Sequence, residues 1–373
     1  MVAIQYADSQ TGNASNSCGL PISPRNFDTI MDLGKQLFKD YWHMVCHRRE
    51  LPNDGDFLRL KSPVGDVVIF NDSGDYVAFD NKCPHRGTLI YSGNSGNQAS
   101  TCKYHGWTYK HGRMIIPSVE QFSGCNIERA TLMKYKLEWC GDFLFLGVKP
   151  TKTLYDQLDA VAEHIENISF NISERLDLNA YEYECAWPLA IENALEPYHI
   201  GMIHPATLAT LKLEDGENLF YGENSIWQAP VGDSRIRSQL GKLGKYFSID
   251  YRYDGYMSIF MFPFTMISST FGYSYSLQNF FPHQVSDDRT NFVSRFLACS
   301  AKDQHANSII RPFLESSAAI NRKVFDEDHS ICKLIPADSW SAEPLEFISV
   351  QEAKIAHFRS LCKFNADDSR VAP

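Results

Sequence analysis

Two short segments of this chain combine side chains that bind soft transition metals. Cys83-Pro-His85 and Cys102-Lys-Tyr-His105 each supply one thiolate and one imidazole, and sixteen residues separate the two segments. Tetrahedral zinc accepts two sulfur and two nitrogen ligands, but zinc fingers usually pair Cys with Cys and His with His. One Cys and one His in each segment instead suit a cluster in which two Cys bind one iron and two His bind the other. The spacing therefore predicts a [2Fe–2S] cluster, with zinc as the alternative.

A second group of metal-binding side chains lies about one hundred residues further on. Glu196 and His199 are three residues apart, so on a helix they would share a face. Pro205 disfavours helical backbone at His204, so the helix should end there and could turn His204 back toward His199. Two imidazoles and one carboxylate on one side of a metal leave the opposite positions open, as non-haem Fe(II) requires for O₂ activation.

The residues alone leave two other interpretations of this segment open. It could be a helix that carries two histidines without function, because short motifs match by chance. Glu196-Pro-Tyr-His199 also has the Glu-x-x-His spacing of di-iron bundles, but the sequence contains no second Glu-x-x-His.

The segments CPHRGTLI and CKYHGW resemble the Rieske domain of the ring-hydroxylating and demethylating non-haem iron oxygenases. Respiratory Rieske proteins carry an extra Cys near each ligand pair, whereas Arg-Gly follows His85 here and Gly-Trp follows His105. The segment around His199 is similar to the mononuclear iron motif of the same oxygenase family, and the two motifs occur in the family's order. The resemblance implies that the cluster and the iron are bound by Cys83, His85, Cys102, His105, His199 and His204.

The resemblance also indicates the third iron ligand. In the family this ligand is a carboxylate that follows an acidic residue within a C-terminal helix, which points to Asp328, with Asp326 as the alternative. The third possibility is that Asp326, Glu327 and Asp328 only solvate a helix face.

Two further residues receive roles by resemblance. Most family members have Asp where this chain has Glu196, and that carboxylate links a cluster histidine of one subunit to an iron-ligand histidine of the next. Glu196 is thus expected to bond its own His199 and His105 of the partner subunit. Glu at this position is similar to the branch that acts on choline, carnitine and betaine. Asn193 is expected to line the iron pocket, a buried structural amide being the alternative.

The elements that must position these residues follow from the sequence patterns. Residues 26–40 have helical periodicity, and from about 41 to 150 short strands and turns predominate, with hairpins at 66–79 and 107–113. Further helices are expected at 151–167, 189–203 and 303–333, strands at 245–299, and an irregular tail. We predict an α+β fold, in which an all-β Rieske [2Fe–2S] domain precedes a helix-grip catalytic domain with an antiparallel sheet. We expect residues 1–40 to form an arm and a helix that packs on the catalytic domain. Residues 41–150 are expected to form the Rieske [2Fe–2S] domain, and residues 151–373 the catalytic domain with the mononuclear iron.

Composition excludes several classes of partner. The net charge of -10 and the lack of a dense Lys/Arg stripe argue against nucleic acid. No apolar run is long enough to span a bilayer, and the N-terminus lacks the pattern of a secretory signal, so a cytoplasmic location is expected. The cysteines outside the two ligand segments are expected to be free thiols: Cys18, Cys46, Cys125, Cys140, Cys185, Cys299, Cys332 and Cys362.

The expected function is that of a terminal oxygenase component, which uses O₂ to hydroxylate or oxidatively demethylate a small organic substrate, such as an amine or quaternary ammonium compound. A mono- or dioxygenase acting on aromatic rings is the alternative, and a Rieske electron carrier without oxygen chemistry is a third possibility. The sequence lacks a Gly-x-Gly-x-x-Gly fingerprint, so electrons from NAD(P)H would need a separate ferredoxin or flavin reductase. The family resemblance also implies a homotrimer. Aromatic residues between 246 and 281 could line a substrate pocket, although most are expected to be core.

Overall fold

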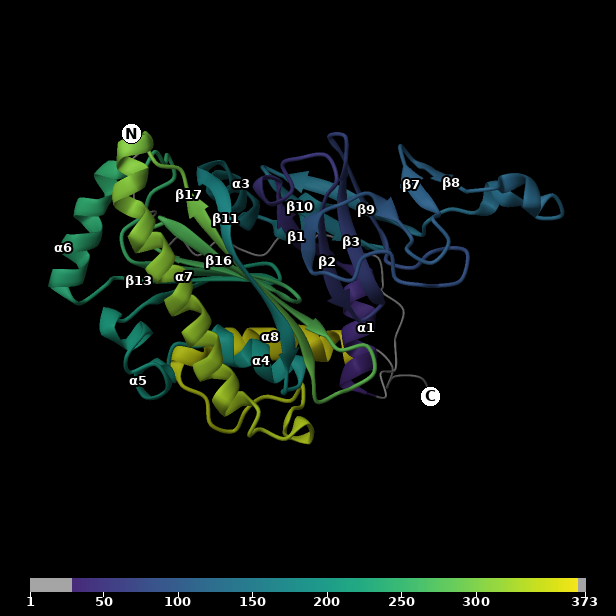
Figure 1. Ribbon diagram of the computed structural model, residues 1–373. Helices are drawn as coiled ribbons and strands as arrows, with labels where there is room; N and C mark the ends of the chain where they lie inside the picture. Colours follow the sequence, from purple (N-terminus) through teal and green to yellow (C-terminus); the bar gives the residue numbers. More distant parts are fainter. Residues whose placement is uncertain (1–28, 368–373) are drawn as a thin grey trace, which may run out of the picture.

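The computed structural model describes residues 29–367 of the chain (Figure 1). Residues 1–28 and 368–373 lie outside the described part. The predicted N-terminal arm, the first residues of the helix predicted at 26–40, and Cys18 therefore fall outside it.

The first β unit carries the two segments that are predicted to bind the cluster. Its seven-stranded antiparallel sheet has the order β1(Trp42–His47), β10(Phe143–Gly147), β9(Lys134–Cys140), β4(Asp75–Asp80), β3(Gly65–Asp72), β2(Asp56–Ser62), β5(Ser95–Asn97). A three-stranded sheet, β6(Ser100–Thr101), β7(Thr108–Lys110), β8(Arg113–Ile115), lies beside it. The predicted hairpins turn at Ser73-Gly74 and at His111-Gly112, where all four residues have positive φ, as tight hairpin turns require.

A second seven-stranded antiparallel sheet forms the scaffold of the rest of the chain. Its order is β11(Ile172–Tyr183), β17(Thr290–Cys299), β16(Ser274–Pro282), β15(Thr265–Thr270), β14(Tyr256–Met261), β13(Asn224–Ala229), β12(Glu217–Tyr221). Strands β14 to β17 account for most of the region that was predicted to be β-rich. The α+β fold with antiparallel sheets is thus confirmed.

Eight helices surround these sheets in the described part of the chain. They are α1(Ile30–Asp40), α2(Leu154–Leu158), α3(Val161–Asn171), α4(Trp187–Leu195), α5(Ile200–Ile203), α6(Ser234–Leu243), α7(Gln304–Cys332) and α8(Ala353–Asp367). The helix predicted at 303–333 is confirmed as α7, and the side chain of Asp303 caps its start by accepting from the backbone N–H of Ala306. The helix predicted at 151–167 is instead two helices, because the chain breaks at Asp159, which has φ of 52°.

The prediction of an irregular tail was wrong, because α8 lies there. Its buried residues include Lys354, Ile355, Phe358, Arg359 and Cys362. Two of these five are basic, so the buried face of the helix does not show the apolar periodicity by which amphipathic helices are recognised.

The helices place their functional residues on one face of the second sheet. Figure 1 shows α7 crossing this sheet, with α4 and α8 below it. α7 contacts β11, β17 and α4, and α4 contacts β16 and α8. α1 packs against the same region, where the indole Nε1 of Trp187 in α4 donates to the backbone oxygen of Ile30. No helix within residues 29–367 has the length and apolarity to cross a membrane.

The described cysteines form no disulfide. Of the eight cysteines that were expected to be free, seven lie within residues 29–367, and each of these is an unpaired thiol. Cys125 is exposed, and the other six are buried.

Candidate metal centres

The two predicted cluster segments form matching turns at one end of the first β unit. The backbone oxygen of Cys83 accepts from the N–H of Gly87 at 2.9 Å, and that of Cys102 accepts from the N–H of Gly106 at 2.9 Å. Both glycines have positive φ, 73° and 72°, a conformation that residues with a Cβ rarely adopt. Each turn thus presents its Cys and His from an equivalent loop.

The four side chains of these loops lie together. The imidazole rings of His85 and His105 have centroids 4.5 Å apart, and the thiols of Cys83 and Cys102 are close enough to hydrogen-bond. Both cysteines are buried, and the buried Nδ1 of His85 has no hydrogen-bond partner within the described residues. The His85 ring stacks on Trp107 at 4.6 Å, which fixes its orientation. Two paired thiols and an unsatisfied imidazole nitrogen fit a bound [2Fe–2S] cluster.

The helix predicted at 189–203 is interrupted in the middle. α4 ends at Leu195, and Glu196 is extended, with φ of -119° and ψ of 142°. The cause is Pro197, because a residue that precedes proline avoids the helical region. The expectation that Glu196 and His199 share a helix face was therefore wrong. The expected helix end at His204 is present, as the end of the short α5.

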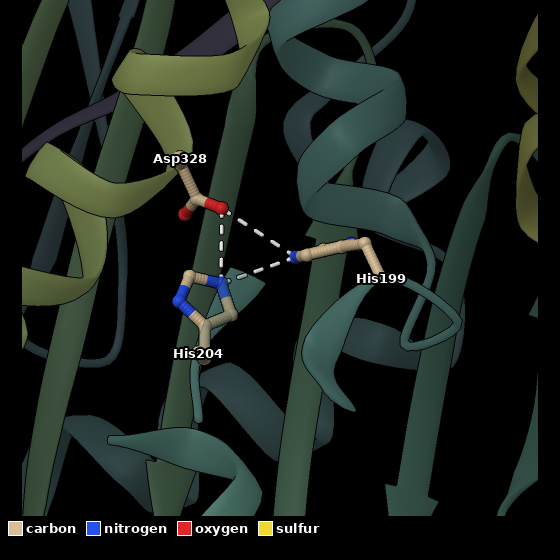
Figure 2. A group of neighbouring side chains, drawn as sticks. All are labelled: His199, His204 and Asp328. Carbon is tan, nitrogen blue, oxygen red and sulfur yellow. Dashed lines mark hydrogen bonds and ion pairs between the residues drawn. The ribbon is translucent and has the colours of Figure 1, made fainter. Parts of the chain in front are cut away.

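The three predicted iron ligands converge, although His199 and His204 flank α5 and Asp328 comes from α7 (Figure 2). His199 Nε2 lies 3.2 Å from His204 Nε2 and 3.4 Å from Asp328 Oδ1, and His204 Nε2 lies 3.0 Å from Asp328 Oδ1. Three ligands about 2.1 Å from one metal and at right angles to one another would lie about 3 Å apart. The three donor atoms therefore fit three adjacent positions around one metal ion. Asp326, the alternative ligand, is exposed and lies outside this group.

The charges of the site favour a cation between these side chains. Burial alone would lower the pKa of His199, but Asp328 and Glu196 outweigh it and raise that pKa to about 9. Burial would likewise raise the pKa of Asp328, but His199 and His204 hold it below its usual value. A metal ion that binds here must therefore displace a proton.

Each of the three side chains is held by a further residue. Glu196 Oε1 lies 2.6 Å from His199 Nδ1, and Asn193 Nδ2 donates to Asp328 Oδ1 at 2.9 Å. Glu327 Oε2 lies 2.8 Å from His204 Nδ1. The predicted residues Glu196 and Asn193 thus lie at the site, and Asn193 also lines its cavity.

Two residues at this site were not predicted from the sequence. Glu327 was considered only as the acidic neighbour of Asp328, and Thr207 was not considered at all. The hydroxyl of Thr207 donates to the same Glu327 oxygen at 2.7 Å. The sequence offered no local signal for either contact, because each joins residues that are at least 120 positions apart in the chain.

A cavity of about 320 Å³ opens onto the three side chains. Tyr256 is the member of the aromatic set between 246 and 281 that lines it, and Trp227 lies beside Tyr256 with ring centroids 5.6 Å apart. The other aromatic side chains of that set are not among the described lining residues, and several, such as Phe247 and Tyr275, are buried in the core. The remaining walls come mainly from residues 193–211, from β14 to β16 and from α7.

Comparison with known proteins places both sites in a family. Residues 41–122 match the Rieske [2Fe-2S] domain, and residues 173–361 match the ring hydroxylating alpha subunit (catalytic domain). The carnitine monooxygenase oxygenase subunit of Acinetobacter baumannii is 27% identical over 215 residues, which are 56% of this chain and 57% of that protein. The anthranilate 1,2-dioxygenase large subunit of Acinetobacter baylyi is 26% identical over 217 residues, 54% of this chain and 44% of that protein. The matched region thus spans about half the length of these relatives.

The fold agrees with solved structures over nearly its whole length. A crystal structure of a quaternary ammonium Rieske monooxygenase in complex with L-carnitine superposes with a TM-score of 0.68, at 19% sequence identity. The superposition covers 89% of this chain and 91% of that one. Because the catalytic-domain family covers half of the sequence, the chain belongs to the ring-hydroxylating alpha subunit family and carries a Rieske [2Fe–2S] domain before the catalytic domain.

Proposed function

We propose that this chain is the terminal oxygenase component of a Rieske non-haem iron oxygenase. It would use O₂ and reductase-supplied electrons to hydroxylate or oxidatively demethylate a small organic substrate. The observation that carries the proposal is the convergence of His199, His204 and Asp328 on one cavity, in a chain that also carries a Rieske domain. An amine or quaternary ammonium compound is the proposed substrate class, supported by Glu196 and by the similarity to carnitine monooxygenase subunits.

The protein residues divide the work between binding and positioning. His199, His204 and Asp328 would hold an Fe(II) ion, which supplies O₂ activation at its open positions, while Cys83, Cys102, His85 and His105 would hold the cluster that supplies electrons. Glu196 and Glu327 each accept from the Nδ1 of one histidine, so they keep both Nε2 atoms directed at the common point. Asn193 orients Asp328 in the same way.

A subunit contact is the proposed route for electrons. Figure 1 shows β7 and β8 at one end of the molecule and α5 at the other, so the loop that precedes β7 and the segment that precedes α5 are far apart within one chain. Both regions expose apolar side chains: Tyr104 is 64% and Met202 is 84% exposed. These side chains are available for a contact between subunits. The proposed assembly is a homotrimer in the cytoplasm, in which Glu196 contacts His105 of the partner subunit, served by a separate ferredoxin or flavin reductase.

An aromatic substrate is the second candidate. Trp227 and Tyr256 at the cavity favour it, because aromatic faces stack on flat rings. The same pair also suits a quaternary ammonium group through cation–π attraction, so these two residues do not separate the two classes. The similarity to the anthranilate dioxygenase subunit is the other support for this candidate.

Iron content tests the proposal against a Rieske electron carrier. The purified holoenzyme is expected to contain about three iron atoms per chain, against about two for a carrier that has the cluster alone. Iron analysis of the protein, with the cluster quantified by its visible absorbance, gives the ratio. Two irons per chain after reconstitution with Fe(II) would exclude the oxygenase.

Replacing Glu327 by alanine is expected to weaken iron binding. His204 loses the acceptor that fixes its ring, and such losses cost about 10- to 100-fold in metal affinity. The measurement is the iron retained after dialysis against a chelator of graded concentration. Glu315→Ala is the matched control, because Glu315 lies on the same helix with a side chain that is 60% exposed. Equal iron retention by the two variants would show that Glu327 does not contribute to iron binding.

A further inference from the structure

Lys354 in α8 is a buried lysine beside the cavity. Its exposed fraction is 1%, and its Nζ lies 3.5 Å from the hydroxyl of Ser258. Ser258 lies on β14 and lines the cavity. Lysine is almost never fully buried without a partner, because burying an ammonium group costs several kcal/mol. Burial accordingly lowers the pKa of Lys354 to about 7.

Arg359, a second buried basic residue of α8, is paired with a carboxylate, unlike Lys354. Arg359 makes two hydrogen bonds to the carboxylate of Glu192 on α4, at 2.7 and 2.8 Å. Trp340 donates to the same carboxylate at 2.7 Å. Glu192 is therefore already occupied. Among the described side chains, those of residues 29–363, the hydrogen-bond partner of Lys354 is the neutral hydroxyl of Ser258, and no carboxylate offsets its buried charge.

The cavity floor next to Lys354 is a row of hydroxyl groups. Ser258 pairs with Ser268 on β15, and Ser268 pairs with Ser276 on β16, so the three side chains share one face of the sheet. All three line the cavity. An ammonium group can only donate, so the Ser258 oxygen accepts from it and the hydroxyl hydrogen remains free to donate into the cavity. Gln278 lies against Ser268 and Ser276 in the same row, at 3.5 and 3.4 Å.

We infer that Lys354 and Ser258 form an anchor for a carboxylate on the substrate. The inference rests on the proposed function, because it concerns the substrate of the same cavity. A carboxylate at this floor would accept from the Ser258 hydroxyl and offset the buried positive charge of Lys354. A carboxylate held at the serine row would leave the rest of the substrate in the same cavity, which also opens onto His199, His204 and Asp328.

Matched pairs of compounds test the anchor by binding alone. Glycine betaine and choline share a trimethylammonium group, and benzoate and benzyl alcohol share a phenyl ring; in each pair only the first compound carries a carboxylate. We expect the holoenzyme to bind the carboxylate in at least one pair about tenfold more tightly, as measured by titration calorimetry. Lys354→Met should remove this preference and change the affinity for the alcohol by less than about twofold. Ser258→Ala should reduce the preference in the same direction.

Three results would contradict the anchor. They are no binding of either carboxylate, no preference for the carboxylate over the alcohol in either pair, or an equal loss of affinity for the carboxylate and the alcohol in Lys354→Met. Lys363→Met is the matched control, because Lys363 lies on the same helix with its side chain 39% exposed. Binding without O₂-dependent turnover of any compound would contradict the proposed function and leave the anchor standing. Turnover of an alcohol by an enzyme that does not bind the carboxylates would contradict the anchor alone.

Stability against pH provides a second readout that needs no ligand. Lys354 has a pKa of about 7 in the folded chain, against 10.5 for an ordinary lysine. The unfolded chain therefore holds more protons between these values, and stability should rise with pH from 7 to about 10. The titratable group that interacts with Lys354 is His357 on the same helix. Burial lowers the pKa of His357 and Lys354 helps to lower it, so His357 is already neutral at and above pH 7 and the comparison of wild type with Lys354→Met by thermal unfolding is made from pH 7 to 10. An unfolding temperature of Lys354→Met that falls below wild type at pH 7 would contradict an unpaired buried ammonium.

Discussion

Replacing His199 by alanine is expected to abolish substrate oxidation and to leave the visible spectrum of the Rieske cluster unchanged. The variant loses one of three donor atoms that lie within 3.4 Å of one another, and it also loses the contact between Glu196 and that ligand. Loss of a group that acts as part of a unit costs most of the rate, here at least about a thousandfold. Product formation and iron content per chain are the two measurements.

His305→Ala is the control for this variant. His305 lies on the same helix as Asp328 and is exposed, so its removal should change neither iron content nor turnover. If the His199→Ala enzyme still oxidises substrate, the iron site is elsewhere. If it loses the cluster absorbance as well, the two sites are not independent.

Glu196→Gln is expected to keep both metal sites loaded and to slow electron transfer between them. The carboxylate accepts from His199 at 2.6 Å and is proposed to accept from His105 of the partner subunit. Glutamine keeps the size but loses the charge, and hydrogen bonds to charged groups are worth about 1.5 to 3 kcal/mol. Such a loss corresponds to about 10- to 100-fold in rate.

The rate is measured as the re-oxidation of the reduced cluster by O₂ in the presence of substrate, followed by absorbance. Glu196→Asp separates charge from reach, because it keeps the charge on a shorter side chain. Rapid re-oxidation in Glu196→Gln would remove the bridging role. Slow re-oxidation in both variants would show that reach matters as well as charge.

The cluster loops were accessible to sequence reasoning because their ligands are local. Cys83 and His85 occupy one turn, Cys102 and His105 another, and the spacing within each turn is fixed by the chain. The convergence of the two turns depends on strand pairing across the first β unit, which the sequence indicates only as a set of short strands. The mixed fold followed from the same local patterns.

The iron site was only partly accessible. His199 and His204 are close in sequence, but Asp328 is brought to them by the packing of α7 on α5, and its choice over Asp326 came from resemblance. The break at Glu196 could have been predicted, because Pro197 gives the same warning as Pro205. The contact of Glu327 with His204 could not, since it joins residues that are far apart in the chain.

Lys354 illustrates what sequence patterns conceal. A lysine in a charged tail is normally assigned to the surface, and its burial follows only from the packing of α8 against β14. Lys354 and Arg359 also interrupt the apolar pattern of α8, so the helix was not predicted from the sequence. Charged residues on the buried face of a helix therefore make the helix hard to predict from the sequence. In this chain one of them, Lys354, also belongs to the proposed carboxylate anchor.

A single-turnover experiment on the reduced holoenzyme tests directly whether this chain is an oxygenase. The cluster is reduced chemically, excess reductant is removed, and O₂ is added with glycine betaine, carnitine or benzoate in separate reactions. We expect at least one of these three compounds to accelerate re-oxidation of the cluster and to yield an oxygenated or demethylated product in the same reaction. Re-oxidation at one rate with and without every compound, with no product from any of them, would contradict an oxygenase and leave an electron carrier.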